Sequence, residues 1–91
     1  MIEPIAALQF GNLSADILRS IAALDHGNLA QYQSSLDRAY TTLSALRQSG
    51  NPRAYEEGLL MLRGFMHAKA RGTLIRFKNE LNRLMVAFPA V

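Results

Sequence analysis

The chain has 91 residues, of which 49% are hydrophobic and 19% charged, and it contains no cysteine. This composition is typical of one small globular domain, and it excludes a disordered chain, a disulfide framework and thiolate metal ligands. The net charge of +3 is uneven, because residues 51–91 hold seven basic and three acidic side chains, a net charge of +4, while residues 1–50 carry −1.

Residues 1–12 are an apolar lead-in, for which we predict a turn or two of helix that ends at Gly11 and Asn12. Glu3 and Pro4 stand where a signal peptide would have a basic region, and no apolar run approaches the roughly 18 residues of a membrane span. We therefore expect no signal peptide, no transmembrane helix and a cytoplasmic protein. Export without a cleavable signal peptide is compatible with the same start.

The first clear helix is predicted over residues 14–25. Ser14 is a residue type that caps helix starts, and Asp16 suits the positive end of the helix dipole. Gly27 is a stop signal, and Asn28 can cap the helix that follows. The apolar stripe of this segment consists of Ile17, Leu18, Ile21 and Leu24.

A second helix is predicted over residues 29–48, with one buried seam and an opposite face of Gln, Ser, Thr and Asp. Gly50 suits the left-handed position that closes a helix, Asn51 can cap the next one, and Pro52 fits its first turn. The seam consists of Leu29, Tyr32, Leu36, Tyr40, Leu43 and Leu46.

The third segment, residues 52–88, has apolar residues at spacings of three and four, close to a heptad repeat, with a stutter between Met66 and Leu74. We expect one long helix that bends near Gly72; the alternative is a break there into helices over about 52–71 and 73–88. A continuous helix of this length would be roughly 55 Å long. The stripe consists of Tyr55, Leu59, Leu62, Met66, Ala70, Leu74, Phe77, Leu81, Leu84 and Phe88.

Two further features of this segment bear on packing. Further apolar residues widen the stripe, so more than one face of the segment needs covering. Gly58, Gly64 and Gly72 either permit close helix–helix approach or lie on the exposed face, and the sequence leaves both open. The widening residues are Leu60, Met61, Phe65, Ile75, Met85 and Val86.

These elements predict an all-α protein, an antiparallel helical hairpin or bundle of three or four helices, in one domain over residues 1–91. Because a long C-terminal helix cannot bury its stripe against shorter partners, we expect it to self-associate or to bind a partner helix. The predicted contact residues are Tyr55, Leu59, Leu62, Met66, Leu74, Phe77, Leu81 and Leu84.

The titratable residues form no catalytic or metal-binding pattern. His26 and His67 lack the spacing of helix-borne metal ligands, and no activated nucleophile accompanies the Asp25–His26 pair. Glu56 and Glu57 fall in the first turn of a helix, where carboxylates favour the dipole. We therefore expect a non-enzymatic protein with no cofactor and no metal.

The basic residues of the C-terminal segment suggest an alternative function. Lys69, Arg76 and Arg83 recur every seven residues on one helix face, and Arg71 and Lys78 form a parallel pair. Such a stripe could bind nucleic acid, anionic lipid or an acidic protein. It could equally be a solvated face with local Arg76–Glu80 and Glu80–Arg83 pairs.

The second half of the chain resembles the small helical-hairpin proteins of type III secretion. Asn51-Pro52, Tyr55, the run Thr73–Lys78 and the apolar stretch to Phe88 resemble the C-terminal helix of needle subunits. The run Gly50–Tyr55 followed by Leu59-Leu60 is similar to the turn and second helix of the needle co-chaperones. The resemblance covers residues 50–88, while residues 1–27 match neither group, and needle subunits are more polar. It implies a non-enzymatic polymer subunit or a chaperone for one.

Overall fold

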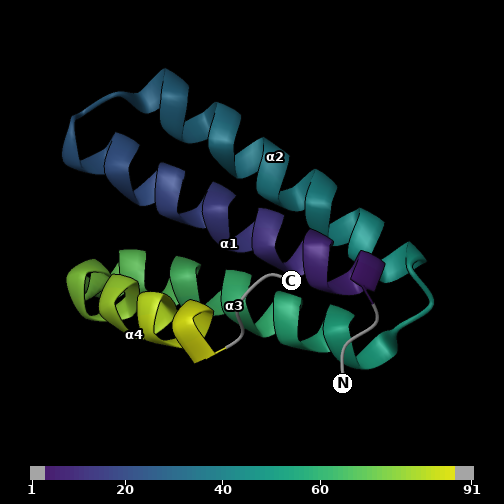
Figure 1. Cartoon of the computed structure of the whole chain (residues 1–91). Coiled ribbons are helices and arrows are strands. Elements are labelled where there is room, and N and C mark those ends of the chain that lie inside the picture. The colour runs from purple at the N-terminus through teal and green to yellow at the C-terminus, as the bar shows by residue number, and fades with distance from the viewer. Residues whose placement is uncertain (1–3, 88–91) are drawn as a thin grey trace.

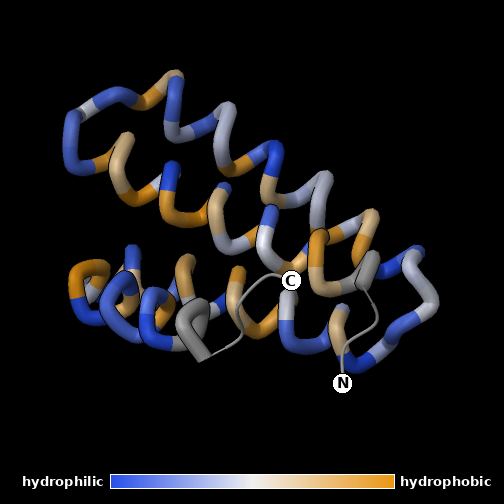
Figure 2. Tube along the Cα trace, in the orientation of Figure 1, coloured by the Kyte–Doolittle hydropathy of each residue, from blue (hydrophilic) through white to orange (hydrophobic). Residues whose placement is uncertain are grey.

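The computed structural model describes residues 4–87, and over this range the chain is all-α, as the sequence predicts (Figure 1). The four helices are α1 (Pro4–Asp25), α2 (Leu29–Gln48), α3 (Pro52–Arg71) and α4 (Leu74–Ala87). Helices α1 and α2 form one antiparallel pair, and α3 and α4 form a second pair that lies against α1 (Figure 1). Helix α2 is the more polar member of its pair (Figure 2).

Our prediction of one long C-terminal helix is wrong for this structure, because α3 ends at Arg71 and the chain then folds back. Gly72 adopts a left-handed backbone conformation, with φ of 72°. The Thr73 amide donates to the Ala68 carbonyl (2.9 Å) and the Gly72 amide to the Lys69 carbonyl (3.4 Å), which is the Schellman pattern of helix ends. The alternative break, near residues 71–73, is the observed one. The predicted end at Phe88 lies outside the described residues.

The start of the first helix also differs from the prediction. Helix α1 begins at Pro4 and runs through Gly11, where we expected a stop. Ser14 is not a cap: its Oγ donates to the Phe10 carbonyl one turn earlier (3.0 Å). Leu13 is fully buried in the core, and this packing outweighs the cost of roughly 1 kcal/mol for a glycine inside a helix. Residues 1–3 lie outside the described range.

Helix α2 spans Leu29–Gln48, the predicted range, but its seam is narrower than predicted. Leu29 and Tyr40 are exposed, whereas the other seam residues are buried. The reason is that only one side of α2 is covered: it packs on α1 and α3, and within the described residues it does not contact α4. The helix caps are as expected, since the Asn28 and Asn51 side chains accept from the Gln31 and Ala54 amides at 3.0 and 3.1 Å.

The core lies between the two pairs and is centred on Phe65 of α3, which is fully buried. Its ring centroid is 6.5 Å from that of Tyr32 on α2 and 6.1 Å from that of Phe77 on α4. These are ordinary separations for tilted aromatic pairs. One side chain therefore connects three of the four helices.

Two glycines that the sequence left open lie at close helix contacts. A Cβ on Gly58 would be 2.8 Å from Leu46 Cδ2, 3.0 Å from Leu13 Cδ2 and 3.3 Å from Leu43 Cδ1. A Cβ on Gly64 would be 3.1 Å from the Phe77 ring. The missing side chains thus let α3 approach the first pair and let Phe77 of α4 rest on α3.

The interface between α1 and α2 contains buried polar groups, among them Asp16, which we expected at the start of a helix and which lies in the middle of α1. Asp16 is almost fully buried; it accepts from Arg19 Nη1 (2.8 Å) and from Thr42 Oγ1 (3.4 Å). Ser20 Oγ donates to the Asp16 carbonyl (2.9 Å). Ser35 Oγ is buried and has no hydrogen-bond partner among the described residues.

Replacing Ser35 with alanine is expected to stabilise the fold by about 0.5–1 kcal/mol. A buried hydroxyl without a partner is costly to desolvate, and alanine removes it with little change in shape. Chemical denaturation measures the free energy of unfolding. Ser20→Ala is the matched control, because that hydroxyl does have a partner and its loss should bring no such gain. A destabilised Ser35→Ala variant would contradict the assignment of Ser35 as unpartnered.

Candidate partner-binding groove

An apolar groove lies where α1, α3 and α4 meet. Five of its lining side chains are apolar, and they come from one position on α1, two on α3 and two on α4. Leu60 stands at its edge with 62% of its surface exposed. The apolar lining residues are Phe10, Leu60, Met61, Phe77 and Leu81.

Two carboxylates, Glu57 of α3 and Glu80 of α4, also line the groove, and both are exposed. Glu80 is 3.6 Å from Arg76 Nε, but both side chains are more than half exposed, so this pair is weak. Among the described residues, no basic side chain lines the groove. An apolar floor with acidic walls therefore favours a ligand that is apolar on one side and basic at its flanks.

The groove has a volume of about 240 Å³. Pockets that hold cofactors or drug-sized molecules are typically about 300–1,000 Å³. The groove is therefore better suited to one or two large side chains of a protein partner. This is the geometry by which grooves accept the anchor residues of an amphipathic helix.

The residues predicted to contact a partner are mostly used inside the chain. Leu62 is buried in the core and cannot face a partner in this arrangement, whereas Leu81 is also buried but lines the groove. The remaining five with described side chains are half-buried and pack against the core: Tyr55, Leu59, Met66, Leu74 and Phe77. The Leu84 side chain lies outside the described part of the structure. The stripe is covered because α4 folds back, which removes the reason for expecting it to be exposed.

Of the groove residues, Phe77 and Leu81 were predicted as contacts, whereas Phe10, Leu60 and Met61 were not. The lead-in residue Phe10 reaches the groove because α1 extends back to Pro4. Leu60 lies outside the three-and-four stripe and was noted only for widening the apolar surface. Its exposure depends on where α4 lies across α3, and that follows from the break at Gly72.

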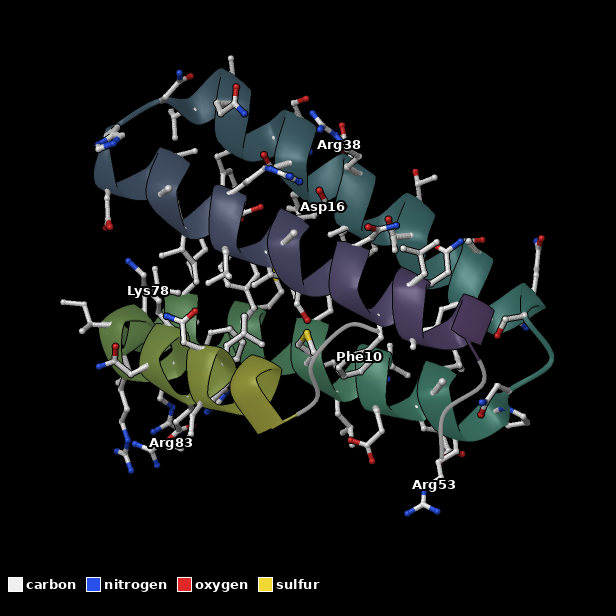
Figure 3. All side chains as sticks on the ribbon, in the orientation of Figure 1. Phe10, Asp16, Arg38, Arg53, Lys78 and Arg83 are labelled. Carbon is white, nitrogen blue, oxygen red and sulfur yellow. The ribbon has the colours of Figure 1, made fainter. Side chains whose placement is uncertain are left out.

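The basic stripe is not continuous in the structure. Because the helix breaks at Gly72, Lys69 and Arg71 belong to α3 while Arg76, Lys78 and Arg83 belong to α4. Lys69 Nζ lies 4.7 Å from the centroid of the Tyr32 ring, directed towards α2. On α4, Lys78 and Arg83 extend from opposite sides of the helix (Figure 3). All five side chains are exposed, but they do not form a single basic face.

The described residues contain no group of three His, Cys, Asp or Glu side chains that could hold a metal ion. His26 and His67 are both exposed and belong to different parts of the fold. None of the helices in the described range is long and apolar enough to cross a membrane.

No protein-family model matches the chain, and comparison with curated proteins and with solved structures gave no significant match.

Proposed function

We propose that this chain is a non-enzymatic interaction protein that binds a helix of a partner protein through its C-terminal half. The observation that carries the proposal is the groove between α1, α3 and α4, with exposed Leu60 at its edge. The proposed ligand is an amphipathic helix whose apolar stripe is flanked by Lys or Arg, because Glu57 and Glu80 line the groove.

The resemblance to needle subunits and needle co-chaperones supports this kind of role, since both act through helix contacts and neither is an enzyme. A place in a secretion apparatus rests on that resemblance alone. Nucleic-acid binding, the alternative from the basic stripe, loses its main support with the separation of Lys69 from the cations of α4.

The groove is tested with a fluorescent synthetic helix that carries leucine on one face and lysine on its flanks. We expect this peptide to bind, and Leu60→Asp to weaken its binding at least about tenfold, because a charge would enter the apolar contact. Fluorescence anisotropy gives the affinities. Circular dichroism checks that the variant keeps its helical content, which an exposed substitution should preserve.

Two controls make this test specific. Leu29 on α2 is 70% exposed and lies outside the groove, so Leu29→Asp should leave the affinity unchanged. A peptide with the same leucines but glutamate flanks should bind much more weakly. Equal losses for both variants, or equal affinity for both peptides, would contradict the proposed groove.

A further inference from the structure

The turn between α3 and α4 has the Schellman bonds described above, but it differs from the other two breaks at the start of the helix that follows it. Helices α2 and α3 each begin with an asparagine side chain that accepts from a backbone amide, at Asn28 and Asn51. Within the described residues, Thr73 makes no such bond at the start of α4. The turn before α3 is further fixed by Pro52, which cannot continue a preceding helix. The turn at Gly72 has neither device.

Apolar residues at helical spacing continue across this turn, with the stutter between Met66 and Leu74. The seam on α3, through Leu62 and Met66, is followed at spacings of four by Ala70 and Leu74 and then by the α4 seam. Ala70 is exposed in the folded-back chain, although it belongs to the stripe. No residue from Gly72 to Leu74 is a proline, so a helix could continue through all of them.

Within the part of the chain that the structure describes, helix α4 packs on α1 and α3. Its described contacts include the Phe77 ring, which lies against Gly64 and Phe65, and the buried side chain of Leu81. A second copy of the chain offers the same surface. A helix that leaves its own chain and takes the equivalent place on a partner recovers these contacts, and only the turn itself differs between the two forms.

We propose that two copies of this chain exchange α4, with each turn at Gly72 straightening into one helix over residues 52–87. In the resulting dimer, α3 of each copy lies antiparallel to α4 of the other. The partner is therefore a second copy of this chain. The surface that it contributes is the apolar seam of α4, which includes Leu74, Phe77 and Leu81. This exchange goes beyond the proposed function, because it does not depend on a ligand in the groove.

Gly72→Ala is expected to shift the chain towards the dimer and to lower its dissociation constant by at least about tenfold. Alanine is disfavoured at the positive φ of the turn and is favoured over glycine inside a continuous helix, so both effects act in one direction. Light scattering after size exclusion, over a concentration series, measures the dissociation constants of the wild type and the variant.

Gly50→Ala is the matched control. Gly50 has the same kind of backbone conformation, with φ of 78°, and an added Cβ meets nothing within 4 Å, as at Gly72. Because Pro52 prevents fusion of α2 with α3, Gly50→Ala strains a turn without permitting a longer helix, and its dissociation constant should equal that of the wild type.

Ile75→Pro provides the opposite test. Ile75 is 77% exposed in the first turn of α4, where proline is tolerated, but in a continuous helix proline would clash with the preceding turn. We expect this variant to remain monomeric at concentrations where Gly72→Ala is dimeric. If Gly72→Ala unfolds, the proposal is tested by comparing the wild type with Ile75→Pro. We expect the wild type to dimerise at millimolar concentration and Ile75→Pro to stay monomeric.

Spin labels distinguish the exchanged dimer from a dimer of folded-back chains. Both labels are placed on one chain, at positions 57 and 80, and the labelled chain is diluted with unlabelled protein so that only the distance within a chain is measured. The exchanged dimer should show a distance of roughly 35 Å within one chain, from 23 residues of continuous helix. Three results would each overturn the proposal: a wild type and Gly72→Ala that both stay monomeric, equal dimerisation of Gly72→Ala and Gly50→Ala, or a dimer with only short distances. A loss of peptide binding in Leu60→Asp bears on the groove and leaves this proposal unaffected.

Discussion

Replacing Phe65 with alanine is expected to destabilise the chain by about 3–5 kcal/mol, the largest effect of any substitution considered. Phe65 is fully buried, and it is the ring that contacts both Tyr32 and Phe77. Its removal leaves a cavity among three helices that cannot all close on it. This loss is a large part of the about 5–15 kcal/mol of stability that a domain has in total. Since 1 kcal/mol shifts the melting temperature of a domain of this size by about 4–8 °C, the melting temperature should fall by more than about 12 °C.

Thermal and denaturant unfolding followed by circular dichroism measure this loss. Tyr40→Ala is the control, since it removes an aromatic ring from α2 that is half exposed and lies outside the core. Its effect should be within about 0.5 kcal/mol. If the two variants lose similar stability, Phe65 is not the centre of the core.

The second large effect is expected at Gly58, where Gly58→Leu should destabilise the fold by about 1–3 kcal/mol. The first added atom alone would approach three leucine side chains, from Leu13, Leu43 and Leu46, that are already buried. The gain of about 1 kcal/mol in helix propensity offsets only part of this overpacking. Denaturant unfolding again gives the value.

Gly11→Leu is the same substitution in another helix interior, at a site where an added Cβ meets nothing within 4 Å. It should stabilise the chain by about 0.5–1 kcal/mol, because only the helix propensity changes. The two variants are therefore expected to have opposite signs. A stabilised Gly58→Leu would mean that α3 does not approach the first pair as closely as described.

The sequence predicts the local features of this fold better than the contacts between helices. The all-α class, the range of α2 and the two asparagine caps follow from short-range rules of propensity and capping. The prediction failed at Gly11 and Gly72, two glycines with the same local preference and opposite outcomes. Gly11 stays inside a helix because Leu13 and Phe10 pack on the rest of the chain, whereas Gly72 ends one.

The candidate groove exists because the chain turns at Gly72 and does not turn at Gly11. A stripe of three-and-four spacing identifies Phe77 and Leu81 as apolar contacts, but it cannot say whether their partner is another molecule or the same chain. With the turn at Gly72, most of the stripe is covered internally, whereas Leu60, which lies outside the stripe, is exposed and lines the groove. The groove is made of residues from α1, α3 and α4, and no local pattern in the sequence connects Phe10 with Leu60.

The core and the groove both depend on the fold-back at Gly72, and one distance tests this fold-back directly. Because the chain has no cysteine, spin labels can be attached at Glu57→Cys and Glu80→Cys, two exposed positions that line the same groove. In dilute monomer we predict a distance below about 20 Å, since packed helices have axes about 8–10 Å apart. A monomer with a distance of roughly 35 Å, as in one continuous helix, would contradict the account.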